Sequence, residues 1–100
     1  MTVFVLAPDL MDRSKITAAV PTAVVVRRAE ELTVAAGDIV VVDLSRPGAL
    51  DAAGPLVAAG ARVVGFASHV DRGGLDAARA AGCEVYARSA FFSRVAALVG

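Results

Sequence analysis

The chain alternates between alanine-rich segments and short runs of β-branched residues, in a repeated order. Three segments share the pattern, namely VAAGDIVVVDLS at Val34–Ser45, VAAGARVVGFAS at Val57–Ser68 and RAAGCEVYARS at Arg79–Ser89. A glycine after two alanines is typical of the left-handed position that ends a helix, and the run that follows it is typical of a strand. The glycines are Gly37, Gly60 and Gly82. The repeat therefore predicts consecutive helix, turn and strand units around one parallel sheet.

Extending the pattern over the whole chain predicts five strands and five helices. The strands are expected at Thr2–Leu6, Thr22–Val26, Asp38–Val42, Arg62–Ala67 and Glu84–Ala87. The helices are expected at Leu10–Val20, Ala29–Ala36, Leu50–Ala59, Asp71–Ala81 and Ser89–Val99, with Asp71 and Ser89 as N-caps. The strands are continuously apolar rather than alternating, which is typical of strands with helices on both faces. Residues 1–100 show no linker, so we expect a single α/β domain.

The last predicted helix carries more apolar side chains than one buried stripe requires. If the stripe that contains Phe91 faces the sheet, Phe92 and Ala96 lie toward the flank or outside. Phe92 beside Tyr86 would then form an apolar patch, and such patches on small domains mark contact sites. The alternative is that Phe92 packs under the preceding helix.

Composition narrows the classes of partner. Ten Lys and Arg residues balance ten Asp and Glu residues, so the basic excess typical of nucleic-acid binders is missing. No apolar run reaches the roughly 18 residues of a membrane span, and no secretion signal is recognisable. Cys83 is the only cysteine, which excludes an internal disulfide and fits a reducing compartment. We expect a cytoplasmic protein without a membrane or nucleic-acid partner.

Polar residues follow the predicted strands, and in a parallel sheet such positions share one edge, where ligands bind. They are Asp9, Asp43, Ser45, Arg46, Ser68, His69, Asp71, Arg88 and Ser89. One interpretation is a ligand site, and the other is an ordinary solvent-facing edge. For the single histidine, a hydrogen bond within its loop is favoured over catalysis or metal binding.

Four segments resemble the receiver domains of response regulators. DIVVVDLSRPG resembles their third strand and its exit, where an aspartate is followed by a Pro-Gly turn. VFVLAPDLMDRSKI, VVGFASHVD and GCEVYARSAF resemble the first, fourth and fifth strands with their exits. The likeness covers almost the whole chain and implies a flavodoxin-like (βα)5 three-layer sandwich with strand order 2-1-3-4-5 and shortened first two helices. It places Asp43 at the phosphoacceptor position and puts the output on the face formed by the fourth helix, fifth strand and fifth helix.

The magnesium positions of the receiver pattern are altered. Receivers hold Mg²⁺ with two acids after the first strand, but those positions are Ala7 and Pro8, and only Asp9, one step further, is acidic. Mg²⁺ requires near-octahedral oxygen ligands and commonly one or two carboxylates. Asp9 and Asp43 alone would hold it weakly, so no cofactor is expected.

The other two receiver positions are displaced by one residue. The Thr or Ser that ends the fourth strand is Ala67 here, with Ser68 one step late, and the lysine after the fifth strand is Ser89, with Arg88 one step early. Phosphoryl transfer depends on positioning and charge neutralisation, so these displacements favour an inactive site.

Asp43 has two interpretations. It is a working phosphoacceptor, or it is a strand-end carboxylate that pairs with Arg46 or Arg88 or caps its own loop. Three functions correspond to these alternatives and to the polar edge. The expected one is a non-catalytic pseudo-receiver, not an enzyme, that contacts a protein partner or a second copy through Tyr86, Phe92 and Ala96. The alternatives are a genuine phosphoacceptor of a two-component system and a small-molecule sensor.

Overall fold

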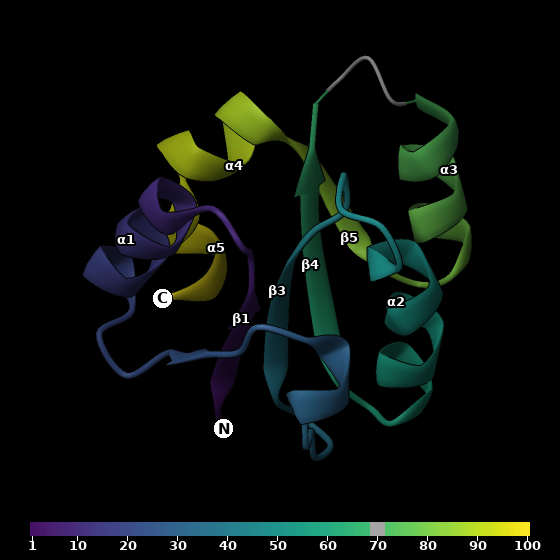
Figure 1. Cartoon of the computed structure of the whole chain (residues 1–100), viewed down its shortest axis with the longest axis horizontal. Coiled ribbons are helices and arrows are strands. Elements are labelled where there is room, and N and C mark those ends of the chain that lie inside the picture. Colours follow the sequence, from purple (N-terminus) through teal and green to yellow (C-terminus); the bar gives the residue numbers. More distant parts are fainter. Residues whose placement is uncertain (69–71) are drawn as a thin grey trace.

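The computed structural model describes residues 1–68 and 72–100, and it contains a five-stranded parallel sheet (Figure 1). The strands are β1 (Val3–Leu6), β2 (Val24–Val25), β3 (Ile39–Asp43), β4 (Arg62–Ala67) and β5 (Glu84–Ala87). Their order is β2-β1-β3-β4-β5, and every neighbouring pair is parallel. The predicted flavodoxin-like α/β fold and strand order are therefore confirmed.

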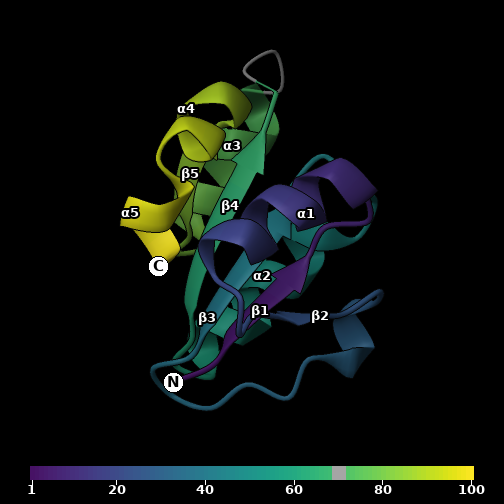
Figure 2. The same cartoon turned by 90° about the vertical axis from the view of Figure 1, so that its left-hand side faces the viewer.

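Helices cover both faces of the sheet (Figures 1 and 2). Helices α2 (Ala49–Ala58) and α3 (Arg72–Ala80) lie on one face with a 3₁₀ turn, η1 (Ala29–Glu31). Helices α1 (Leu10–Ala19), α4 (Arg88–Ser93) and α5 (Val95–Val99) lie on the other. Along β3, Val40 and Val42 face the first group, and Ile39 and Val41 face the second. The strand is apolar throughout because both of its faces are covered.

The second predicted helix, Ala29–Ala36, is wrong beyond its first turn. Only η1 is helical, and Leu32 is already extended, with φ −77° and ψ 120°. The cause is Asp38, whose carboxylate accepts hydrogen bonds from the backbone N–H groups of Ala35 and Thr2, both at 2.9 Å. These bonds lower the pKa of Asp38 and hold the chain in a turn before β3. Because the carboxylate binds the backbone, it competes with helix formation.

The last predicted helix, Ser89–Val99, is broken into two. Arg94 lies between α4 and α5 with φ −133° and ψ 18°, outside the helical region. The break allows Phe91 and Val99 both to be buried, since the second segment turns to pack against α1. Ser89 is not the N-cap as predicted: α4 begins one residue earlier, after Ala87.

Phe92 is not the exposed residue of the predicted patch. It is half-buried and packs edge-on against both Phe66 and Phe91, with ring centroids 5.0 Å apart in each pair. Phe66 and Phe91 stack on each other at the same distance. Phe92 therefore packs against the core on the face that α1 covers. The alternative interpretation, in which Phe92 packs under the preceding predicted helix, is also wrong, because that helix is α3 on the opposite face of the sheet.

Gly65 in β4 lies against the side chain of buried Leu44. A Cβ at Gly65 would lie 2.4 Å from Leu44 Cδ1 and 2.7 Å from Leu44 Cγ, which no contact of real side chains allows. We predict that Gly65→Ala destabilises the fold by about 1–3 kcal/mol through overpacking. The control is Gly54→Ala in α2, where a Cβ meets nothing within 4 Å. Urea unfolding should show the loss for Gly65→Ala alone, and equal midpoints for the two variants would contradict this account.

Candidate functional site

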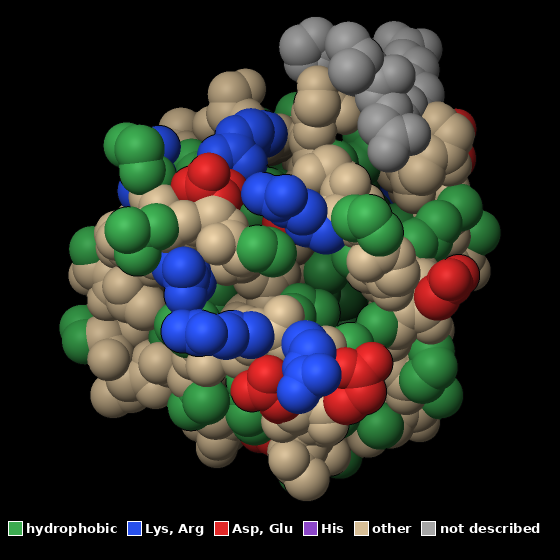
Figure 3. Space-filling model, in the orientation of Figure 1, with side chains coloured by type: hydrophobic (Ala, Val, Ile, Leu, Met, Phe, Trp, Pro, Cys, Tyr) green, Lys and Arg blue, Asp and Glu red, His purple; other side chains and the backbone are tan. Residues whose placement is uncertain are grey.

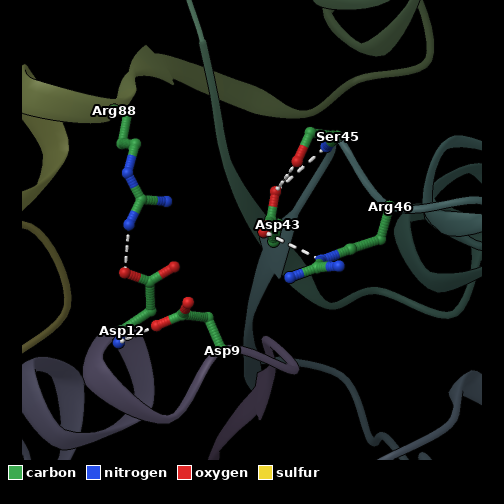
Figure 4. Close-up of polar contacts among 6 residues, drawn as sticks. All are labelled: Asp9, Asp12, Asp43, Ser45, Arg46 and Arg88. Atoms are coloured by element: carbon green, nitrogen blue, oxygen red, sulfur yellow. Dashed lines mark hydrogen bonds and ion pairs between the residues drawn. The ribbon is translucent and has the colours of Figure 1, made fainter.

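The strand ends bring one group of polar residues together at the carboxyl edge of the sheet (Figure 4). Asp9 and Asp12 come from the start of α1, Asp43 ends β3, and Arg88 follows β5. The group contains two buried carboxylates, which require partners because burial of an unpaired charge is costly.

Asp43 is engaged by its own loop. The residue is 4% exposed, and Oδ1 accepts hydrogen bonds from the Ser45 backbone N–H at 3.0 Å and from Ser45 Oγ at 2.6 Å. Oδ2 faces Arg46 Nε at 3.6 Å. Of the pairings considered from sequence, the structure contains those with Arg46 and with the loop backbone, and it places Arg88 elsewhere. Asp43 therefore closes the loop after β3.

Arg88 forms an ion pair with Asp12 instead. Its Nη2 donates to Asp12 Oδ1, and this bond is the main reason why the pKa of Arg88 is raised. Asp12 is 1% exposed, and its Oδ2 has no hydrogen-bond partner among the residues described. The pair joins α1 to the start of α4 across residues that are 76 positions apart.

The Arg88 guanidinium also lies over two aromatic rings. Its Cζ is 5.6 Å from the ring centroid of Phe66 and 5.1 Å from that of Phe92, and Lys15 Nζ is 5.2 Å from the Phe92 centroid. Such cation–π contacts add to the attraction of the ion pair. Arg88 is thus held from two sides, by a carboxylate and by aromatic faces.

Asp9 is the N-cap of α1. Its Oδ1 accepts the backbone N–H of Asp12 at 3.0 Å, and this hydrogen bond is the main cause of its lowered pKa. A carboxylate at this position stabilises a helix by satisfying a free N–H and by its favourable interaction with the helix dipole. Asp9 and Asp43 each bind a different segment of backbone.

The remaining predicted positions are solvent-facing or outside the described residues. Ser68 and Ser89 are exposed, and within the described residues the hydrogen bonds to the Asp43 carboxylate come from Ser45 instead. His69 and Asp71 lie outside the described residues. Within residues 1–68 and 72–100, no group of three or more His, Cys, Asp or Glu side chains is arranged to hold a metal ion. Cys83 is free and buried, and its burial raises the pKa of the thiol.

Asp12 is the residue that sequence reasoning missed. It lies two positions inside α1. The expectation that residues directly after parallel strands share one edge of the sheet therefore does not include it. The available signal is spacing, because Asp12 shares its helix face with Ile16 and Val20, both of which are buried. An acid on the apolar side of a helix indicates a buried partner, but it does not reveal that the partner is Arg88.

The chain has no significant match among protein-family models, curated proteins or solved structures. In the part of the chain that the structure describes, no helix has the length and apolar character needed to cross a membrane. What can be said of the class of this protein comes from its fold and from the contacts at the carboxyl edge of its sheet. It is a flavodoxin-like α/β domain whose strand-end aspartate is bound by its own loop.

We predict that Arg88→Met destabilises the fold by about 2–3 kcal/mol. The change leaves the buried Asp12 carboxylate unpaired, and the loss is below the roughly 3–5 kcal/mol of a fully buried pair because Arg88 is half exposed. Adding Asp12→Leu should restore most of the stability, since two apolar groups replace the pair. Urea unfolding measures each step.

The control for this cycle is Arg94→Met, an exposed arginine a few residues further on. It should change stability by no more than about 0.5 kcal/mol. If Arg88→Met costs no more than Arg94→Met, the ion pair does not contribute to the stability of the fold.

Proposed function

We propose that this domain is a non-catalytic, receiver-like signalling module that acts through protein contacts. The observation that carries the proposal is the state of Asp43, whose two carboxylate oxygens are engaged by Ser45 and Arg46. The receiver resemblance makes this aspartate the phosphoacceptor, and its local contacts give it a structural role instead.

Attack on a phosphoryl donor needs a carboxylate oxygen that is free and lies in line with the leaving group. It also needs cations positioned at the transferring oxygens. At Asp43, Oδ1 accepts two hydrogen bonds, which reduce its electron density and fix its direction. Oδ2 has Arg46 beside it, whose charge stabilises the resting carboxylate. These contacts favour the resting state over the attack.

The cation after β5 supports the same proposal. In receivers the corresponding lysine serves the phosphoacceptor, but here Arg88 pairs with Asp12 and lies over the aromatic rings of Phe66 and Phe92. Release of Arg88 toward Asp43 would leave the Asp12 carboxylate buried without a partner. The cation after β5 therefore serves Asp12 in an ion pair and does not serve Asp43.

A module that acts without chemistry requires a contact surface. The receiver resemblance favours the face of α3, β5 and α5, where Ala96 is exposed and Tyr86 is half-buried. The most exposed large apolar side chains near the edge lie elsewhere, at Leu10 (69%) and Met11 (68%) on α1. We place the primary contact on the α3, β5 and α5 face and treat the α1 surface as the competing one.

Asp43 should remain unmodified when the protein is incubated with acetyl phosphate and Mg²⁺. Both of its oxygens already have partners, so intact-mass spectrometry should show no phosphoryl adduct, and beryllofluoride should leave the amide shifts of Ser45 and Ser68 unchanged. A receiver domain of known activity, treated in parallel, controls for the reagents. Stoichiometric modification that disappears in Asp43→Asn would contradict the proposal and establish a working phosphoacceptor.

The contact surface is tested with two charge insertions on different faces. Ala96→Glu on α5 should weaken self-association in sedimentation at least about tenfold, without lowering the melting temperature, because Ala96 is exposed. Leu10→Glu on α1 is the matched control and should leave self-association unchanged. The opposite pattern would move the contact to α1, and a wild-type monomer at all concentrations would remove the self-association part of the proposal.

A further inference from the structure

A cavity of about 290 Å³ lies beside Asp43, where the loops after β1, β2 and β3 meet. In strand order 2-1-3-4-5, the chain passes from β1 to β2 in one direction and then returns across β1 to β3. Ligands of open parallel sheets bind in the crevice that such a reversal creates. The cavity therefore occupies the position where the topology itself favours a ligand.

Three arginines line this cavity, namely Arg27, Arg28 and Arg46. Arg27 has no hydrogen bond or ion pair within the described residues. Arg28 has only an exposed contact with Glu31 at 3.9 Å, and Arg46 pairs with Asp43 at 3.6 Å. A second, adjoining hollow is lined by Arg13 and by Arg27, and the Nε of Arg13 is buried without a hydrogen-bond partner.

The positive charge is local to this face, since the chain as a whole is neutral. Figure 3 shows Lys and Arg side chains gathered around a recess whose floor is apolar. Two acids, Glu30 and Asp43, also line the cavity, and Asp43 is already balanced by Arg46. With Arg13 at the adjoining hollow, the arginines outnumber the acids, and the Arg27 guanidinium has no partner in the part of the chain that the structure describes.

Helix α2 begins at the wall of the same cavity. Its N-cap is Gly48, with φ +79°, so no side chain caps the first turn of this ten-residue helix. The backbone N–H of Ala49 donates to the Arg46 carbonyl at 3.2 Å, and the positive end of the helix dipole adds to the field of the arginines. Arginine is suited to phosphate because its planar fork of donors matches the phosphate oxygens.

We propose that this cavity binds the phosphate group of a small phosphate monoester, with Arg27, Arg28 and Arg46 as its cationic ligands. The cavity also has apolar walls from Leu6, Pro8 and Pro47, against which the uncharged body of the ester rests. The volume lies just below the range of about 300–1,000 Å³ that is typical of small-molecule sites, so the ligand must be small or partly exposed. The proposal is independent of the fate of Asp43 as a phosphoacceptor, because binding needs no covalent step.

The test is a titration of the ¹⁵N-labelled protein with three probes at constant ionic strength: adenosine 5′-monophosphate, inorganic phosphate and adenosine. The monophosphate should give saturable shifts at the amides of Arg27, Gly48 and Ala49. Inorganic phosphate should bind there more weakly, and adenosine should not bind. Equal affinities for the monophosphate and inorganic phosphate would overturn the assignment of an ester, and equal affinities for the monophosphate and adenosine would overturn the phosphate site.

Arg27→Gln should weaken monophosphate binding at least about tenfold, because a charge-assisted hydrogen bond is lost. Arg94→Gln is the matched control, an exposed arginine that does not line the cavity. Arg27 is exposed, so its replacement leaves the core intact, and a thermal melt checks this. The proposal is overturned if neither phosphate probe gives saturable shifts, or if the two variants lose affinity equally.

Discussion

Burial of β3 on both faces is the constraint on which the rest of this structure depends. All five residues from Ile39 to Asp43 are buried, which requires helices above and below and a strand on each side. The alternating side chains of β3 supply the centres of two separate apolar cores. The helices on each face then pack against one of these cores rather than against each other.

The same constraint explains the polar contacts at the edge of the sheet. Because β3 ends while still buried, the carboxylate of Asp43 cannot be satisfied by water alone and is bound by Ser45 and Arg46. Asp12 on α1 is buried as well, and it is paired with Arg88 for the same reason. The two buried carboxylates thus have separate arginines, Arg46 in the loop after β3 and Arg88 at the start of α4.

This division places the two buried carboxylates in separate ion pairs and leaves a cavity beside Asp43. A receiver needs its acids and its cation at one point, whereas here the charges are distributed over two ion pairs. Arg46 instead borders the cavity at the reversal of strand order, together with Arg27, which has no ion pair among residues 1–68 and 72–100. At the carboxyl edge, Asp43 is held by Ser45 and Arg46, and a cavity lined by three arginines lies beside it.

The sequence by itself determined the strands, their parallel arrangement and the residues at the sheet edge, because β-branched runs and Ala-Ala-Gly helix ends are local signals. The tertiary structure decided which charges meet. The pairing of Asp12 with Arg88 depends on how α1 and α4 pack, and no local spacing contains that information. It also decided that Phe92 packs against Phe66 and that the second predicted helix is cut short. Both outcomes involve distant residues, because Phe66 lies in β4 and the Asp38 carboxylate binds the backbone of Thr2. Contacts between distant residues depend on the whole packed fold, whereas the β-branched strands and the Ala-Ala-Gly helix ends depend mainly on neighbouring residues.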